Sequence, residues 1–251
     1  MNGLGLFRPR IERLRTMPSR QRGEFAFGKY VVEYTDPRSF YGEYKDIFES
    51  RIYHFDTTSP APVIVDAGSC IGMSVLYFKS VYPGARITAF EPDSGMCEVL
   101  RRNLARNGAS DVRVVNAGLG KSEGSASFVP DGADGGSMVA GAGSASERVT
   151  IQVTKLSSYL DGPVDFLKMN IEGMEGDVFE EIEPRLAQVK ELAFEYHCFH
   201  DLPQNLGKIL QILDRQGFRY AVTDATNAKI GVPITLPPAY RYFNLVYARR
   251  A

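Results

Sequence analysis

The feature that most constrains the fold is an apolar run that ends in an acid and a glycine-bearing turn. It reads Val63-Ile-Val-Asp66-Ala-Gly68-Ser-Cys70-Ile-Gly72. A second apolar run, Ile87-Thr-Ala-Phe, ends at Glu91, nineteen residues after Gly72. Since an amphipathic segment lies between the two runs, the pattern predicts a strand–loop–helix–strand unit, which is typical of a nucleoside-binding edge.

The residues of the turn indicate which nucleoside fits. The dinucleotide fingerprint requires a second glycine, because the backbone must come close to a pyrophosphate. That position is Cys70 here, and the third glycine position is Met73. A ligand without a pyrophosphate therefore suits the turn better, and S-adenosylmethionine (SAM) is the expected cofactor.

Composition narrows the function classes. The 251 residues, 44% hydrophobic and 24% charged, suit one globular domain with a small N-terminal addition. A net charge of −1 argues against a dedicated nucleic-acid binder. No apolar stretch approaches the roughly 20 residues of a membrane helix, and no secretory signal is recognisable. We expect a small-molecule substrate and no nucleic-acid or membrane partner; whether the chain forms a homo-oligomer stays open.

Three cysteines, Cys70, Cys97 and Cys198, have no metal-like spacing and are odd in number, which predicts reduced thiols in a cytoplasmic protein. Six arginines lie between residues 8 and 22 against a single Glu12. A solvated terminus is favoured over a docking arm for an acidic partner.

Periodicity divides the chain into an N-terminal extension, 1–57, and a SAM-binding domain, 58–251. In the extension, residues 24–34 predict two short strands, and apolar residues at three- and four-residue intervals predict a helix over 40–55, which is either core or a lid.

From residue 63 onward strands and helices alternate, which predicts an α/β fold with a mostly parallel sheet and helices on both faces. The expected strands are 63–66, 86–91, 111–116, 122–129, 148–153, 164–170, 191–196, 218–223 and 241–248. The expected helices are 72–82, 94–107, 174–183 and 203–216. The prolines between the last two strands favour a terminal hairpin with one antiparallel strand. The glycine- and serine-rich segment 130–146 is interpreted as a lid.

Polar or small residues follow five successive strands, where ligands bind in open parallel sheets. We expect Gly68 and Gly72 to allow close approach of the ligand, Glu91 to accept hydrogen bonds from ribose hydroxyls, and Asn116 to contact adenine. The full expected cofactor set is Asp66, Gly68, Ser69, Gly72, Glu91, Pro92, Asn116 and Asn170. Alternatively, Asp66 only braces the loop, Glu91 is an exposed strand end, and Asn116 is an ordinary turn residue.

The chain resembles the FkbM family of SAM-dependent methyltransferases from about Tyr44 to Gly217. The resemblance is carried by Ile64–Gly72, Ala89–Asp93, Asp165–Glu175 and Glu195–His197. It implies a class I, Rossmann-like methyltransferase with a seven-stranded sheet, commonly an O-methyltransferase of natural-product or glycan assembly. It also implies that Asp66, Gly68, Gly72 and Glu91 belong to the SAM site, and that Lys168, Asn170, Glu172 and Glu175 lie at the active-site edge.

Two residues depart from the family pattern. Asn170 stands where the family usually has Asp, so a role that needs negative charge there is in doubt. Cys70 stands where Asn is usual.

Methyl transfer to a hydroxyl benefits from a positioned base. His197, directly after the expected strand 191–196, is the first candidate, with Glu172 or Glu195 as orienting residues; a hydrogen-bonded loop histidine is the alternative. Tyr41, Tyr53, Glu175 and His200 are the expected substrate contacts. No metal is expected, because metal-like spacing is lacking. Two other functions stay open: a nicotinamide-dependent oxidoreductase, and a SAM-binding partner protein without turnover.

Overall fold

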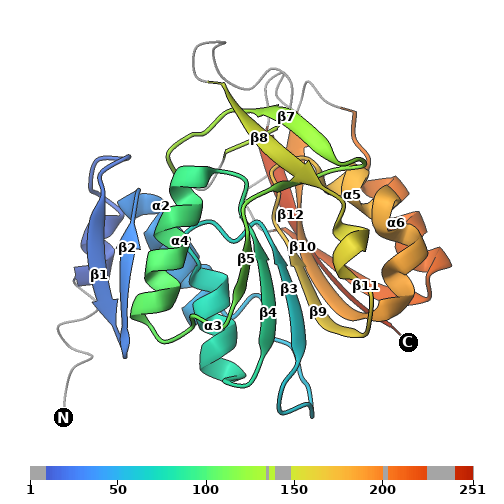
Figure 1. Ribbon diagram of the computed structural model, residues 1–251, viewed down its shortest axis with the longest axis horizontal. Helices are drawn as coiled ribbons and strands as arrows, with labels where there is room; N and C mark the ends of the chain where they lie inside the picture. Colours follow the sequence, from blue (N-terminus) through green and yellow to red (C-terminus); the bar gives the residue numbers. More distant parts are fainter. Residues whose placement is uncertain (1–9, 134–135, 139–147, 200–202, 225–240, 251) are drawn as a thin grey trace, which may run out of the picture.

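The computed structural model describes residues 10–133, 136–138, 148–199, 203–224 and 241–250. In these ranges the chain forms a central seven-stranded sheet, a small three-stranded sheet and an N-terminal hairpin (Figure 1). Helices α3 (Met73–Val81) and α4 (Ser94–Arg106) cover one face of the central sheet, and α5 (Glu175–Ile182) and α6 (Leu206–Arg215) cover the other. The predicted α/β architecture is confirmed.

The central sheet is parallel except for one strand. Strand β12 runs antiparallel to both of its neighbours, β10 and β11, which confirms the predicted terminal hairpin. In spatial order the strands are β11 (Phe218–Asp224), β12 (Arg241–Arg250), β10 (Val189–Phe199), β9 (Val164–Met169), β3 (Val63–Ala67), β4 (Arg86–Phe90) and β5 (Arg113–Val115). All six residues of β9 are buried, as expected for a parallel strand covered on both faces.

Helix α4 shows how local sequence positions the site. The Asp93 carboxylate accepts hydrogen bonds from the backbone N–H groups of Gly95 and Met96, and so caps the helix directly after β4. Gly108 adopts a left-handed φ of 75° just after the end of the helix, a conformation that glycine favours. The buried residues of the helix include Met96, Val99, Leu100 and Leu104.

The N-terminal extension contains the predicted strands β1 (Gly23–Phe27) and β2 (Tyr30–Tyr34). The single helix expected over 40–55 is wrong. An α-helix, α2 (Pro37–Glu43), begins earlier because Asp36 caps it, and it continues as a π-helix, η1 (Tyr44–Glu49). Arg51 then adopts a left-handed φ of 58°, so the helix cannot continue to residue 55.

The extension shares its core with the following domain. The rings of Phe55 and Phe166 stack at 4.5 Å, and Phe48 meets Tyr77 of α3 edge-on at 5.6 Å. The outer edge of β2 is also bound to α4. The side-chain amide of Asn103 both donates to and accepts from the Glu33 backbone, and Asn107 does the same for Val31.

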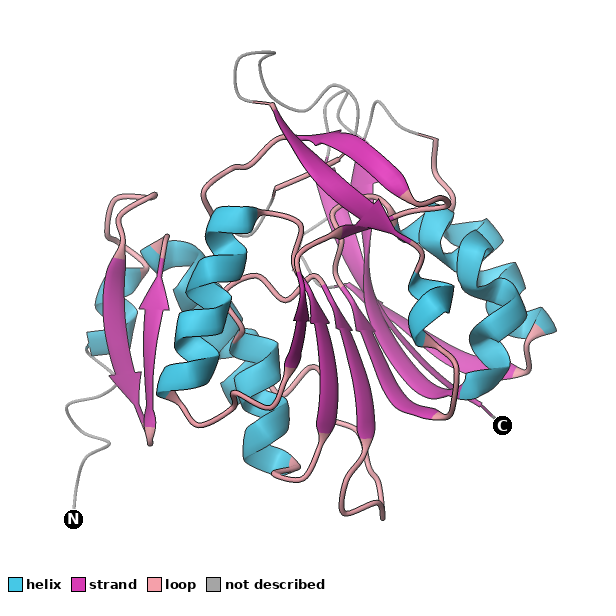
Figure 2. Cartoon of the chain, in the orientation of Figure 1, coloured by secondary structure: helices cyan, strands magenta, loops and turns pink. Residues whose placement is uncertain are grey.

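A separate three-stranded sheet lies over the carboxyl ends of the central strands (Figure 2). It consists of β6 (Gly118–Leu119), β7 (Gly124–Phe128) and β8 (Val149–Thr154). A short 3-10 helix, Leu156–Tyr159, follows β8, and another, Glu183–Gln188, follows α5. The sequence predicted β7 and β8 but missed β6, because two residues carry no periodic signal. In the glycine- and serine-rich segment expected to be a lid, residues 134–135 and 139–147 lie outside the described residues, and lid motion stays a prediction.

The part of the segment that is described connects to the central sheet. Val129 and Ser137 exchange backbone hydrogen bonds, and the Ser137 hydroxyl donates to the Glu172 carbonyl at 3.0 Å. No helix in the described ranges is long and apolar enough to cross a membrane.

Candidate active site

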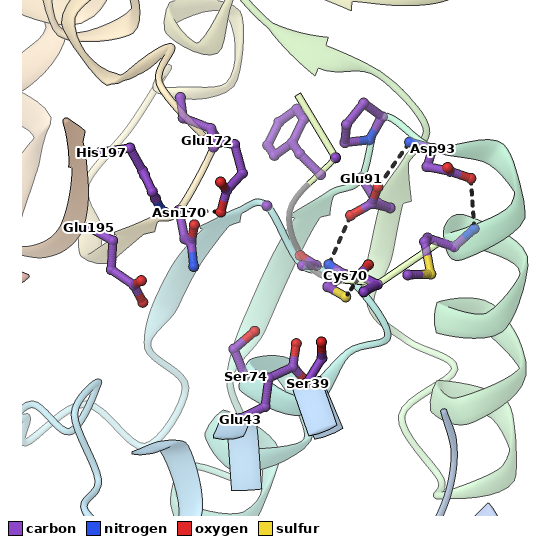
Figure 3. A pocket seen from close by; sticks show the side chains of 18 of the residues that line it. Ser39, Glu43, Cys70, Ser74, Glu91, Asp93, Asn170, Glu172, Glu195 and His197 are labelled. Carbon is purple, nitrogen blue, oxygen red and sulfur yellow. Dashed lines mark hydrogen bonds and ion pairs between the residues drawn. The ribbon is translucent and has the colours of Figure 1, made fainter. Parts of the chain in front are cut away.

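A cavity of about 600 Å³ lies at the carboxyl ends of β3, β4, β9 and β10 (Figure 3). Its size is within the range of small-molecule sites, roughly 300–1,000 Å³. Its walls come from the loops after these strands, from α2 and η1 of the N-terminal extension, and from the small sheet. Three groups of polar side chains face it: one around Glu91, one around His197, and one around Ser39 (Figure 3).

The Glu91 group is built by the loop after β3. The Glu91 carboxylate accepts hydrogen bonds from the backbone N–H groups of Cys70 and Asp93, both at 2.9 Å. Burial raises the pKa of Glu91 to about 7, although the two backbone donors lower it. Gly68, with a φ of 83°, is required here because a Cβ atom would lie 1.7 Å from the Asn170 carbonyl oxygen. Glu91, Gly68 and Asn170 all line the cavity, as do the expected Ser69 and Pro92.

Asp66 lies beneath the cavity and does not line it. Its carboxylate is fully buried, pairs with the Lys168 ammonium at 3.1 Å and accepts a hydrogen bond from the Ser74 hydroxyl. Lys168 also donates to the Gly68 carbonyl. The geometry therefore corresponds to the bracing alternative: Asp66 holds in place two residues, Ser74 and Lys168, that do reach the cavity.

Two other expected cofactor contacts also lie outside the lining. The Asn116 amide donates to the carbonyls of Glu91 and Pro92 and accepts from the Ser94 hydroxyl, so it secures the end of β4 instead of facing a ligand. Gly72 is the N-cap residue of α3, and a Cβ atom there would lie 2.7 Å from the Leu100 side chain.

The second group centres on His197. Its Nδ1 lies 2.9 Å from Glu175 Oε1, and its Nε2 lies 3.2 Å from Glu172 Oε1. Burial alone would lower the pKa of His197, but the two carboxylates together raise it well above its ordinary value. Glu175, an expected substrate contact, is buried and does not line the cavity; it contacts the histidine instead. Glu172 and His197 both line the cavity.

Glu195 lies beside this cluster and also lines the cavity. The Tyr53 hydroxyl donates a hydrogen bond to Glu195 Oε1. Burial raises the pKa of Tyr53 well above 10 and also raises that of Glu195. The Lys168 ammonium lies 5.5 Å from the centre of the Tyr53 ring. Tyr53 is therefore a buried part of the cavity wall.

Of the remaining expected contacts, only Tyr41 can be placed, and it is not brought to this site. Tyr41 is absent from the described cavity lining, and its hydroxyl donates to the Glu12 carboxylate at 2.9 Å. His200 lies outside the described residues. His54 is absent from the described cavity lining, and its Nδ1 lies 3.2 Å from the Tyr77 hydroxyl.

The sequence left open whether the helix expected over 40–55 is core or a lid, and it pointed to none of the lining residues that α2 and η1 contribute, which include Ser39, Gly42, Glu43 and Asp46. Residue spacing cannot predict that a helix that precedes β3 in the sequence lies over the carboxyl ends of β3, β4, β9 and β10. The only local signal was the cap at Asp36–Pro37, which marks where the helix begins and not what it faces.

The described residues hold no cluster of three or more His, Cys, Asp or Glu side chains arranged as a metal site. The absence of a metal from the reaction stays a prediction.

The order of the sheet strands and the cavity at their carboxyl ends define a class I methyltransferase fold. The crystal structure of magnesium protoporphyrin IX methyltransferase (ChlM) from Synechocystis PCC 6803 has a similar fold, with a TM-score of 0.51 at 12% identity over 100% of this chain and 93% of that one.

Sequence comparison identifies the family. The methyltransferase FkbM domain matches residues 66–220, and the chain belongs to this family. It is 33% identical over 175 residues to methyltransferase sdnD of Sordaria araneosa, covering 56% of this chain and 68% of that protein. It is 26% identical over 230 residues to methyltransferase 1 of Beauveria bassiana (strain ARSEF 2860), covering 82% and 88%. The chain is therefore a SAM-dependent methyltransferase. Membership of this family argues against the nicotinamide-dependent oxidoreductase that the sequence left open.

Proposed function

We propose that this methyltransferase transfers a methyl group to a hydroxyl oxygen of a small molecule, a natural product or a sugar, by in-line displacement with general-base help. The observation that carries the proposal is that Glu91 and the cluster of Glu172, Glu195 and His197 open into one cavity. A cofactor anchor and proton-accepting groups in a single enclosed space are what such a transfer needs.

The residues around Glu91 suit SAM. An ionised carboxylate accepts hydrogen bonds only, so Glu91 would pair with ribose hydroxyls, which can donate. The glycine-bearing turn Gly68–Cys70 would hold the amino-acid portion, and Pro92 would border the nucleobase. When bound, SAM supplies an electrophilic methyl carbon with a sulfur leaving group.

The acceptor would lie against the ends of β9 and β10, beside Asn170, Glu172, Glu195 and His197. These residues would orient the hydroxyl oxygen about 3 Å from the methyl carbon, and one of the ionisable groups among them would accept its proton. Four apolar residues, Ile47, Ile52, Phe199 and Phe243, also line the cavity and would exclude water.

The test is turnover with radiolabelled SAM and a panel of hydroxylated sugars, phenols and aliphatic alcohols, alongside a matched panel of amines. We expect S-adenosylhomocysteine and a labelled ether from at least one hydroxylated acceptor. SAM binding without turnover of any hydroxylated compound, or labelling of nitrogen alone, would refute O-methylation while leaving the methyltransferase family unaffected.

A further inference from the structure

Both ring nitrogens of His197 face carboxylate oxygens. A neutral imidazole has one N–H donor and one bare nitrogen, whereas the protonated ring has two donors. Glu175 Oε1 lies 2.9 Å from Nδ1 and Glu172 Oε1 lies 3.2 Å from Nε2, so the arrangement calls for a proton on each nitrogen. The backbone N–H of Gly173 also donates to Glu175 Oε1, at 3.2 Å.

An imidazolium cannot accept a proton, so His197 is poorly suited to deprotonate a hydroxyl. Glu172 is also poorly placed, because its Oε1 is engaged by His197 Nε2 at 3.2 Å. Glu175 is also unsuited, because it does not reach the cavity.

Glu195 has the opposite environment. It lies two residues before His197 on β10, so both side chains are on the same face of the sheet, and its carboxylate points into the cavity (Figure 3). The Tyr53 hydroxyl fixes one carboxylate oxygen. Burial raises the pKa of Glu195, and this outweighs the lowering by Tyr53, His197 and Lys168. A buried carboxylate with a raised pKa is a stronger base than an exposed one.

We propose that Glu195, and not His197, accepts the proton of the acceptor hydroxyl, with His197 held as an imidazolium between Glu172 and Glu175. This inference rests on the proposed O-methylation. The hydroxyl proton moves to a Glu195 oxygen as the acceptor oxygen bonds to the methyl carbon, and the sulfur keeps the electron pair of the broken C–S bond. The products are an ether and S-adenosylhomocysteine, and Glu195 then releases its proton to solvent.

In this arrangement His197 is a positioning residue. Its positive charge lies two residues from Glu195 and favours the ionised carboxylate before each turnover. Tyr53 is the second positioning residue, since its hydroxyl holds the carboxylate in one orientation.

The charge of His197 can be measured without an acceptor. The full chain, labelled with ¹⁵N-histidine and saturated with S-adenosylhomocysteine, is studied by NMR at about pH 7.5, a unit above the ordinary imidazole pKa of about 6.5. The His197 signals are assigned by their loss in His197→Gln. We expect two protonated nitrogens; one protonated and one bare nitrogen would overturn the inference, whatever the outcome for O-methylation.

Turnover separates the two candidate bases. With a hydroxylated acceptor from the panel above, Glu195→Gln should lower kcat by about 10²–10⁴-fold at unchanged SAM affinity, and Glu195→Asp should restore part of the loss. His197→Gln should lower kcat less. Glu191→Gln, on the same strand but outside the cavity, is the matched control and should leave kcat unchanged.

A larger loss in His197→Gln than in Glu195→Gln would overturn the assignment. If wild-type protein methylates no hydroxylated acceptor, the proposed function fails and this inference fails with it. A neutral His197 in an active enzyme overturns the inference alone.

Discussion

Glu91 is the single residue whose charge should control cofactor binding. Its carboxylate lines the cavity and is oriented by the N–H groups of Cys70 and Asp93. Replacing it with alanine would remove the charge-assisted hydrogen bonds proposed to the ribose, each worth about 1.5–3 kcal/mol. We expect Glu91→Ala to weaken SAM binding, measured by calorimetry, by at least tenfold. Glu98→Ala, on the exposed face of α4, is the control, and equal affinity of the two variants would refute the ribose assignment.

The same residue predicts a pH dependence. Burial raises the pKa of Glu91 to about 7, so the carboxylate is increasingly protonated below that pH. A protonated carboxyl is the poorer acceptor, so SAM affinity should fall by up to about tenfold per pH unit below about 7 and level off above it. The Glu91→Gln variant has no carboxyl group to titrate at this position, so the pH dependence of its SAM affinity reports the titration of the ligand itself. A wild-type profile that parallels that of the glutamine variant would contradict the prediction.

The Tyr53 hydroxyl should influence the pH at which kcat falls to half its maximum on the acid side. Its hydroxyl donates to Glu195 and lowers the pKa of that carboxylate, against the raising effect of burial. Without the donor the pKa of Glu195 rises further, so the half-maximal point of kcat on the acid side should move to higher pH in Tyr53→Phe. Tyr41→Phe is the control, since that hydroxyl pairs with Glu12 away from the cavity. An unshifted limb, or a shift to lower pH, would contradict the role assigned to Glu195.

At the scale of elements, the loop between β3 and α3 depends on one backbone conformation. Gly68 combines a φ of 83° with a neighbouring carbonyl oxygen that a Cβ atom would approach to 1.7 Å. Gly68→Ala should therefore lower the free energy of unfolding by more than the roughly 1–2 kcal/mol of a left-handed residue, and should abolish SAM binding.

Gly28 in the β1–β2 turn separates the cost of the left-handed backbone conformation from the cost of the steric contact. It has a φ of 53°, but a Cβ atom there would meet nothing within 4 Å. Gly28→Ala should cost only the conformational part and leave SAM binding intact. Urea unfolding and calorimetry of both variants make the comparison, and equal losses would show that the Asn170 contact is unimportant.

The strands of the central sheet could be predicted because each carries its own apolar run, and the acid after β4 was recognisable at its end. The groups that contact the polar residues of the site could not be predicted. Glu175 lies on the helix after β9 and His197 lies near the end of β10, so their contact depends on the adjacency of those two strands. Asp66 and Asn116 bind protein groups that come near them only through packing. Tyr53, an expected substrate contact, does line the cavity, but helical spacing could not place it, because the helix ends at Glu49 and not at residue 55.

At the scale of the whole molecule, the extension over 1–57 and the remainder of the chain share one hydrophobic cluster. This cluster joins Phe27 and Phe40 of the extension to Leu76 of α3 and Leu100 of α4. Because neither part buries these side chains alone, we expect a single cooperative unfolding transition. Fluorescence and far-ultraviolet circular dichroism should therefore give coincident urea curves.

One substitution and one fragment test this expectation. Phe40 is fully buried among Phe25, Phe27 and Tyr34, so Phe40→Ala should lower the free energy of unfolding by about 3–5 kcal/mol in one transition, not by melting the extension alone. The fragment 58–251 should fail to fold, since it exposes the faces of α3 and α4 that the extension covers, and it also lacks the α2–η1 wall of the cavity. A fragment that unfolds cooperatively and binds SAM as the full chain does would show instead that the extension is an independent unit, free to act as a lid.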